Sequence, residues 1–336
     1  MRFKCKECGE SFSTKKSLHS HFKKHDLLVG EYYVKHFPRF DKLTKDPIGF
    51  KRFEQYFASN FNTDENMEEW CKTAPEKEVR EFILEEFKHK VIKKGIKAMP
   101  SSVFLKTAGL PDIDVIKRVF GSYSALAAEL DFPVAYRRGL AESFWKDYSG
   151  VDVFVDTRET KPLVFKNSKT MKLDFGDYSL TAKDYTHTHV ERKSWEDFAL
   201  TVTGGYKRFL RELERCKRSG CYMFIVVETN LNNVEKKNNF AYKRVNLNYV
   251  FHQMREIEIK YQDVCQFVFS GSRPDSTLLI PKLLCLGQEV RHVDIQYFWD
   301  KHLEKHGLGK RESTTTQTFR GYKPKALHKR RLFGGV

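Results

Sequence analysis

Long hydrophobic runs are missing from this sequence of 336 residues. No stretch approaches the ~18 consecutive apolar residues that a membrane-spanning helix needs, so we expect no membrane protein. The first residues, Met1-Arg2-Phe3-Lys4-Cys5, lack the apolar segment of a secretory signal, so we expect a protein that stays inside the cell. The seven cysteines are odd in number, and their spacing does not indicate a disulfide framework.

Aromatic residues, by contrast, are plentiful. They make up 14% of the chain, with 28 Phe, which is enough to fill a core and excludes a wholly disordered protein. The net charge of +16 is concentrated at the two ends: residues 1–25 hold seven Lys/Arg against two Glu, and residues 301–336 hold ten against two. Two basic ends favour a polyanionic partner such as nucleic acid, although a merely solvated surface explains the charge equally well.

The first 25 residues carry a pattern of metal ligands. Cys5 and Cys8 are followed by twelve residues, then His21, three more residues and His25. Thiolate and imidazole are the ligands of a tetrahedral Zn²⁺ site, and a unit this small needs the metal to fold. The pattern resembles the two-Cys two-His zinc finger, a small ββα unit, whose framework apolar positions are also present.

In such fingers, side chains near the start of the helix read bases in the major groove. The resemblance puts Thr14, Lys16, Ser17 and Ser20 at the reading positions, and none of them is the Arg that best reads guanine. One finger covers about three base pairs, so we expect this finger to orient or strengthen DNA binding rather than to define a target alone. A protein-binding finger is the alternative.

Residues 26–149 are predicted to be a helical DNA-binding region. Residues 76–95 have the periodicity of an amphipathic helix, and residues 98–132 read as three short helices separated by Gly109-Leu110-Pro111 and Gly121. The second segment resembles the helical repeats that accompany homing endonucleases. An ordinary helical linker domain is the alternative.

Residues 150–298 are predicted to be an α/β domain with a mixed central sheet, because strand-like and helical segments alternate. The expected strands are 151–155, 162–166, 170–174, 178–182, 188–192, 222–227 and 265–269. The expected helices are 195–202, 206–218, 246–261 and 276–287.

Charged residues in this domain suggest a chemistry. Glu191 and Lys193 lie two apart on a predicted strand, so they share a face, while Arg192 points to the other. Asp177 and Glu191 can then chelate a hard divalent cation, Mg²⁺ or Mn²⁺, and Lys193 can orient water or offset phosphate charge. Many strands carry Glu-x-Lys on a solvent-exposed face, so this pattern alone is weak evidence for a metal site.

The longer string is more specific. Asp156-Thr157-Arg158-Glu159, Gly176-Asp177 and Glu191-Arg192-Lys193 with Asp197 resemble the XPF-family nuclease domain, and Gly204-Gly205 with Arg208 falls where that family has a Gly-Arg run. The resemblance implies a restriction-endonuclease-like fold, Asp177 and Glu191 as metal ligands, and Lys193 as the catalytic lysine.

The resemblance assigns further roles near the metal. Asp156 supports the metal, Arg192 and Asp197 pair and position charges, and Arg158, Glu159 and Arg208 shape the site or hold phosphate. A structural ion pair with the carboxylates is an equal alternative for the arginines. In the family, the nuclease domain itself can also contribute a homodimer interface.

Residues 299–336 are predicted to be a basic flexible tail that contacts phosphate through residues such as Lys329, Arg330 and Arg331. No pair of helix-hairpin-helix units, which XPF-type enzymes use to hold branched DNA, is recognisable after residue 295. If the source is eukaryotic, we expect the protein in the nucleus, because its target DNA is there.

These patterns predict a metal-dependent DNA endonuclease that cuts a restricted set of duplex sites, as homing enzymes do, and leaves 5′-phosphate and 3′-hydroxyl ends. The alternative in the same class is a structure-specific nuclease on branched DNA. The alternative of another class is a zinc-finger regulator that binds DNA without cutting it.

Overall fold

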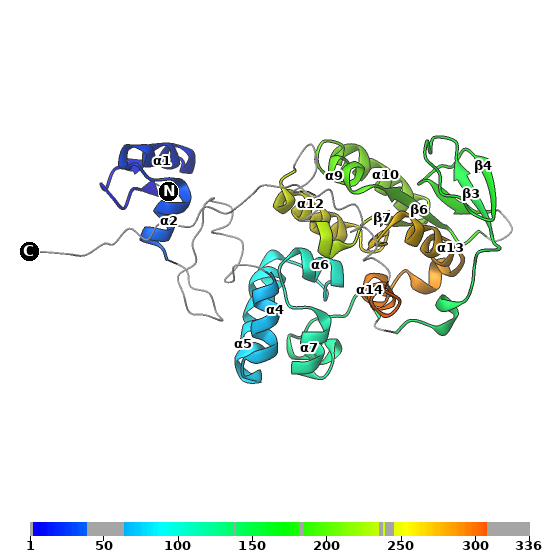
Figure 1. Ribbon diagram of the computed structural model, residues 1–336, viewed down its shortest axis with the longest axis horizontal. Coiled ribbons are helices and arrows are strands. Elements are labelled where there is room, and N and C mark those ends of the chain that lie inside the picture. The colour runs from blue at the N-terminus through cyan, green and yellow to red at the C-terminus, as the bar shows by residue number, and fades with distance from the viewer. Residues whose placement is uncertain are drawn as a thin grey trace, which may run out of the picture.

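The computed structural model describes residues 3–38, 64–137, 139–181, 185–234, 238 and 245–307. It contains a small Cys/His unit, a helical region and a mixed sheet between two layers of helices (Figure 1). The predicted basic tail, including Lys329, Arg330 and Arg331, lies outside the described residues from 308 onward. In the described part of the chain, no helix has both the length and the apolar composition to cross a membrane.

The N-terminal unit is a hairpin followed by helices. Its elements are β1 (Phe3–Lys4), β2 (Ser11–Phe12), α1 (Lys15–His21), a 3-10 turn (Phe22–His25) and α2 (Val29–His36). Leu18, Phe22 and Tyr32 are buried together, and the rings of Phe22 and Tyr32 stack with their centroids 3.7 Å apart. The helix α2 therefore adds apolar contacts that the ββα pattern does not include.

In the described residues from 64 to 137, five helices pack around one core. They are α4 (Asp64–Thr73), α5 (Glu76–Lys90), α6 (Ser102–Thr107), α7 (Ile113–Phe120) and α8 (Tyr123–Glu129). The last three begin where polar side chains accept a hydrogen bond from a backbone N–H three residues on: Ser101, Asp112 and Ser122. These N-caps explain why three such short helices are well defined.

Buried carboxylates join the helical region to the sheet. Asp294 accepts hydrogen bonds from the backbone N–H and the hydroxyl of Ser102, both at 2.6 Å. Glu258 accepts a hydrogen bond from the backbone N–H of Ser101 at 3.2 Å. The start of α6 thus binds two acidic groups of the sheet domain, which accept hydrogen bonds from its otherwise unpaired N–H groups.

The sheet has six strands in the order β4-β3-β5-β6-β7-β8. They are β3 (Asp152–Asp156), β4 (Asn167–Met171), β5 (Tyr178–Leu180), β6 (Thr188–Lys193), β7 (Tyr222–Val227) and β8 (Cys265–Phe269). Only β5 runs antiparallel to its neighbours, so the sheet is mixed, as predicted.

Helices cover both faces of the sheet (Figure 1). One face packs against α9 (Trp195–Thr203), α10 (Tyr206–Arg218) and α12 (Leu247–Lys260). The other packs against α13 (Arg273–Val290) and α14 (Ile295–Lys305). Every residue of β7 is buried, which agrees with its unbroken apolar sequence.

Several segments differ from the expected pattern. The strand expected at 170–174 is β4 and lies three residues earlier, β5 ends two residues before the expected 182, and α13 extends the helix expected at 276–287 by three residues at each end.

Residues 162–166 do not form a strand. Two of their backbone groups are bonded to side chains: the carbonyl of Pro162 accepts from Arg273, and the N–H of Leu163 donates to the hydroxyl of Tyr178. The helix α14 continues past residue 298, where we expected the domain to end, and buries Trp299 and Leu303 in the core.

Candidate functional site

Three acidic residues form a row across one face of the sheet. The register pairs three buried residues on adjacent strands, Val155, Tyr178 and Val190. The next position along this row is Asp156, Asp177 and Glu191. The backbone N–H of Asp156 donates to the Asp177 carbonyl at 2.9 Å, and that of Asp177 donates to the carbonyl of Val190, the residue before Glu191, at 2.8 Å. Because side chains alternate, these carboxylates share the face opposite that buried triplet.

Gly176 allows the chain to pass close to β6 just before Asp177. Its φ is +62°, and a Cβ atom there would lie 2.7 Å from the carbonyl oxygen of Val190. A larger residue would be strained in this conformation and would collide with the strand. The Gly-Asp pair therefore sets the distance between Asp177 and Glu191.

Lys193 lies on the same face as Glu191, as the strand alternation predicts. Its Nζ is 2.5 Å from Oε1 of Glu191, and both side chains are largely buried. Burial opposes the charge of Lys193, but the Glu191 carboxylate outweighs it and raises the Lys193 pKa. The lysine is therefore a cation at neutral pH and can offset negative charge, but it does not serve as a base in this state.

Asp177 carries an unusual proton affinity. Burial, and then the charge of Glu191, raise its pKa to about 8, although Oδ2 accepts a hydrogen bond from the backbone N–H of Arg192 at 2.7 Å. Oδ1 of Asp177 and Oε2 of Glu191 have no hydrogen-bond partner among the described residues. Two such oxygens in a row are the donors that a hard divalent cation takes, so the site fits Mg²⁺ or Mn²⁺.

Asp156 is in the row, but its oxygens are already occupied. Arg158 contacts both of them, with Nε at 2.6 Å from Oδ1 and a terminal nitrogen at 3.0 Å from Oδ2. The backbone N–H of Leu173 donates to Oδ2 at 2.7 Å. Burial opposes the charge of Asp156, yet Arg158 and the backbone donors lower its pKa. Asp156 thus holds the loop beside the site, and only a rearrangement would free it to bind a metal directly.

Arg192 lies on the face opposite the acidic row. Its guanidinium bridges Glu159 and Glu228, each at 2.9 Å, and all three side chains are at least 90% buried. The structure thus favours the structural ion-pair alternative for this arginine. Its contribution to the site passes through its backbone N–H, which holds Asp177.

Asp197 and Arg208 lie on the helices that follow β6. Ser194 caps α9 by accepting from the N–H of Asp197, and its hydroxyl donates to the Asp197 carboxylate at 2.9 Å. Arg208 is exposed in the first turn of α10. Asp197 therefore fixes the start of α9, and Arg208 is open to an external partner.

Glu212 lies next to the acidic row and was not predicted from the sequence. It lies on α10 and accepts a hydrogen bond from the backbone N–H of Gly176. Burial, and then the charge of Glu191, raise its pKa. No sequence signal distinguishes it from Glu214, two residues on, which instead accepts a hydrogen bond from the hydroxyl of Tyr261 at 2.7 Å.

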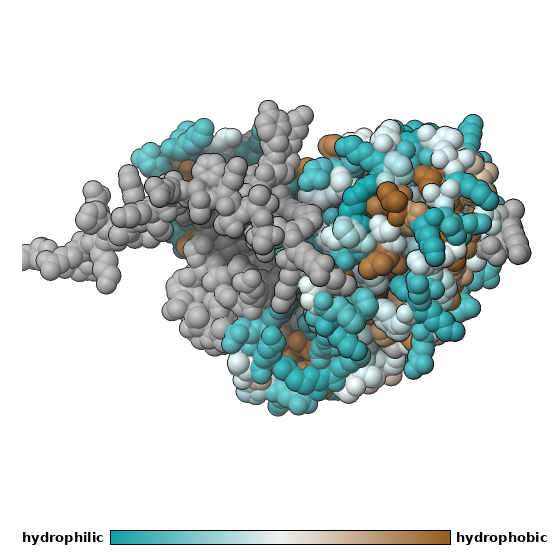
Figure 2. Space-filling view, turned by 45° about the vertical axis from the view of Figure 1, so that its right-hand side comes forward, coloured by the Kyte–Doolittle hydropathy of each residue, from teal (hydrophilic) through white to brown (hydrophobic). Residues whose placement is uncertain are grey.

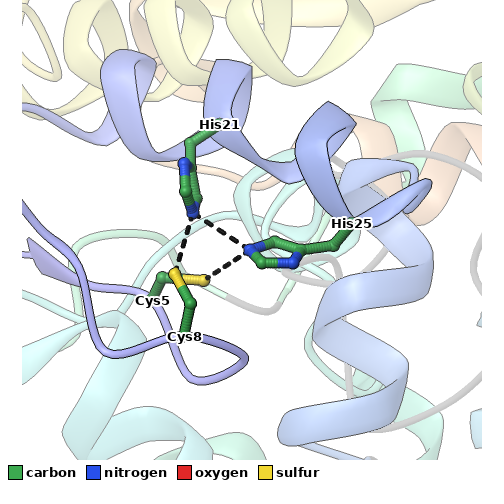
Figure 3. A group of neighbouring side chains, drawn as sticks. All are labelled: Cys5, Cys8, His21 and His25. Atoms are coloured by element: carbon green, nitrogen blue, oxygen red, sulfur yellow. Dashed lines mark hydrogen bonds between the residues drawn. The ribbon is translucent and has the colours of Figure 1, made fainter.

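The four expected zinc ligands converge in the N-terminal unit (Figure 3). One ligand atom from each of Cys5, Cys8, His21 and His25 lies within 4.8 Å of the others. Glu10 lies 3.5 Å from Nδ1 of His21, which leaves Nε2 of that ring for the metal. A set of two thiolates and two imidazoles at these separations fits tetrahedral Zn²⁺.

The proposed reading residues of α1 are all exposed. Two of them are engaged locally: Oγ1 of Thr14 accepts from the N–H of Ser17 at 3.1 Å, and the two hydroxyls are 2.8 Å apart. Lys16 and Ser20 are four residues apart on the same side of the helix. The helix α2 contacts His19 of α1 and Phe22 of the 3-10 turn, while Lys16 and Ser20 stay exposed.

Comparison with known proteins identifies the sheet domain. Residues 155–283 match the family model described as the ERCC4 domain. This segment is an ERCC4 domain, the nuclease domain of the XPF family. It contains the whole acidic row and all nine expected catalytic residues, while the Cys/His cluster lies outside it. No curated protein matches the chain.

The solved structures that resemble part of the chain include two of XPF. XPF from Aeropyrum pernix is 23% identical, with a TM-score of 0.31, over 41% of this chain and 68% of its own. XPF from Aeropyrum pernix in complex with DNA is 20% identical, with a TM-score of 0.30, over 47% of this chain and 82% of its own.

The Asp177 pKa predicts how stability of the ERCC4 domain depends on pH. The folded value of about 8 lies above the ordinary 3.8, so the folded state binds more protons than the unfolded state between these values. Asp177 therefore destabilises the metal-free domain increasingly as pH rises from about 4 to 8. In urea unfolding with a chelator, Asp177→Asn should gain stability relative to wild type over this range, by at most about 1.4 kcal/mol per pH unit. A difference that stays constant from pH 5 to 8 would contradict the environment described for Asp177.

The buried bridge of Arg192 predicts a large loss of stability. Arg192→Met leaves Glu159 and Glu228 buried with less countercharge, so urea unfolding should show a loss of about 3–5 kcal/mol. Lys217→Met is the matched control, because Lys217 forms an exposed ion pair with Asp263 at 3.2 Å and should cost at most about 1 kcal/mol. Adding Glu159→Gln to Arg192→Met should recover part of the loss. Equal losses in the two single variants would show that the bridge does not stabilise the domain.

Proposed function

We propose that this chain is a metal-dependent DNA endonuclease. The observation that carries the proposal is the row of carboxylates on an ERCC4 domain. One oxygen of Asp177 and one of Glu191 accept no hydrogen bond from a described residue, and both residues lie beside the cationic Lys193. In this proposal Asp177 and Glu191 hold Mg²⁺ or Mn²⁺, and Asp156 supports them from the adjacent strand. The Cys/His cluster holds Zn²⁺.

The proposed reaction is hydrolysis of one phosphodiester bond. Water attacks the phosphorus in line, the bond from phosphorus to the 3′-oxygen breaks, and the 3′-oxygen leaves with a proton, which gives 5′-phosphate and 3′-hydroxyl ends. A bound divalent cation would neutralise phosphate charge and favour ionisation of the water. Lys193, held by Glu191, stabilises the negative charge that develops on the phosphate oxygens.

The remaining candidate residues have supporting roles in this proposal. Arg158 holds the Asp156 carboxylate, Arg192 ties Glu159 to the strand end, and Asp197 fixes α9. Arg208 is exposed and free to hold a substrate phosphate. The arginine and aspartate of the Glu-Arg-Lys signature therefore act by positioning rather than by touching the reacting atoms.

For the substrate, we propose a restricted set of duplex sites, as in homing enzymes. The support is the exposed face of the finger helix with Lys16 and Ser20, which α2 does not cover. The helical region offers less support, because five of its cations are engaged in contacts within the protein. A homodimer through the ERCC4 domain would supply the two sites that a double-strand break needs.

The test is a cleavage assay with Mg²⁺ and, separately, with a chelator. Genome-length duplex DNA and a panel of forks and flaps are compared, and the ends of the products are sequenced. Discrete duplex fragments with 5′-phosphates are the expected result. Cutting at junctions alone would contradict the restricted duplex substrate, and DNA binding without any cutting would contradict the nuclease and favour a regulator.

A further inference from the structure

The exposed side of α10 is strongly cationic. Four arginines lie on it, three, four and three residues apart, and we call them the arginine stripe: Arg208, Arg211, Arg215 and Arg218. At 100° per residue their directions fall within about 80° of one another, opposite the side that buries Phe209, Leu213 and Cys216. The stripe is therefore a continuous surface feature about 15 Å long.

Two acidic groups, Glu212 and Asp174, lie near Arg215, but neither forms an ion pair with the arginine stripe. None of its four members forms an ion pair with a described residue. In the helical region, by contrast, five cations have partners inside the protein: Arg80, Lys90, Lys106, Lys117 and Arg118. Four unpaired guanidinium groups on one helix repel one another unless an anion joins them, so the stripe indicates an anionic partner.

The stripe runs beside the acidic row. Glu212, on the same helix, accepts from the N–H of Gly176, the residue before Asp177. The guanidinium of Arg215 lies 5.6 Å from the centre of the Phe175 ring, two residues before Asp177. Beyond it, Arg215 and Arg218 line a cavity of about 520 Å³ together with His187 and one acid, Asp174. The stripe thus leads from the proposed metal ligands to a cationic hollow.

We propose that the arginine stripe binds the backbone phosphates of the DNA strand that passes through the acidic row, with Arg211, Arg215 and Arg218 as contacts that continue from Arg208. This proposal rests on the proposed nuclease function. Along a duplex, phosphates of one strand are about 3.4 Å apart in axial rise, so the stripe spans about four nucleotide steps. Guanidinium groups bind phosphate with paired N–H donors and do not read the base, so the contact positions the strand without specifying sequence.

The visible face of the described residues is mostly polar. In Figure 2 hydrophilic residues cover most of the visible described surface, and hydrophobic residues appear in small separate groups. On the neighbouring helix α9, Leu200 is the one large apolar residue that is exposed. A large apolar docking patch, as a stable protein partner needs, is not present on the described residues in this view.

The test measures DNA affinity as a function of salt, with Glu191→Gln in every protein so that no DNA is cut. Labelled duplex DNA is titrated in a chelator at about 50 to 200 mM salt. Replacing Arg215 and Arg218 by Ala together should reduce the salt slope by about 2, because each lost phosphate contact removes about 0.9. Affinity at about 100 mM salt should fall at least about tenfold.

Lys217→Ala is the matched control, because this lysine lies between the two arginines in sequence but pairs with Asp263 on another side of the helix. Its slope and affinity should equal those of the parent. Equal salt slopes in the parent, the double arginine variant and the control would overturn the proposal. An equal loss of slope in the control and the double variant would also overturn it. Stronger, stripe-dependent binding of an RNA duplex of equal length would overturn DNA as the occupant.

The stripe and the proposed function fail separately. If wild type cuts DNA but the slope is unchanged, only the stripe is overturned. If the double variant loses its phosphate contacts but Glu191→Gln cuts normally, the metal site is wrong and the stripe stands. A protein that binds no DNA at any salt overturns both.

Discussion

Replacing Glu191 by glutamine is expected to lower Mg²⁺-dependent DNA cleavage by at least about 1,000-fold. The side chain keeps its size, but it loses the charge that would bind the cation and the ion pair that holds Lys193 at 2.5 Å. Two functions of the site therefore fail together. Single-turnover cleavage of a DNA that wild type cuts measures the effect.

The control for this prediction is Glu81→Gln, an exposed glutamate on α5 with the same change of charge. It should cut at the wild-type rate. DNA binding by Glu191→Gln should stay within about threefold of wild type, because the variant removes a negative charge and no phosphate contact. Normal cleavage by Glu191→Gln would show that the acidic row is not the site of hydrolysis.

Removing zinc is expected to unfold the N-terminal unit and leave the ERCC4 domain folded. The unit buries few large side chains, chiefly Leu18, Phe22 and Tyr32, which is too small a core to fold alone. Zinc binding to such a unit contributes about 10–16 kcal/mol at neutral pH, so the metal-free form should be unfolded. Proton NMR of the aromatic residues and limited proteolysis, before and after chelation, measure the loss.

Cys5→Ala should reproduce the effect of the chelator, whereas Cys285→Ala, in a partly exposed position on α13, should leave the unit folded. Added Zn²⁺ should restore wild type and not the Cys5 variant. When the unit is unfolded, binding to duplex DNA should weaken, or the positions at which the duplex is cut should change. A folded, protease-resistant unit in the Cys5 variant would contradict the zinc site, and unchanged site choice would make the unit a protein-interaction module.

Much of the site could be predicted from the sequence because it depends on local rules. The alternation of a strand puts Glu191 and Lys193 on one face and Arg192 on the other, and the structure has this arrangement. The spacing of Cys5, Cys8, His21 and His25 likewise predicts a cluster that the structure contains. Apolar runs predicted β7 and β8 with their observed bounds.

What the sequence could not predict depends on contacts between distant segments. The proximity of Glu212 to the row arises from how α10 packs on the sheet, and nothing in its local sequence separates it from Glu214. The partners of Arg192 come from segments 33 and 36 positions away, so its structural bridge was only one of two alternatives. The helix α14 was missed although Ile295, Trp299 and Leu303 follow one another at intervals of four residues, which is a helical spacing.

The most direct measurement is crystal diffraction from the protein soaked in Mn²⁺, with data collected at the manganese absorption edge. We expect an anomalous peak within coordination distance of Oδ1 of Asp177 and Oε2 of Glu191, and no such peak in crystals of Glu191→Gln. Manganese bound elsewhere in an ERCC4 domain that cuts DNA, with none at this pair, would contradict the account.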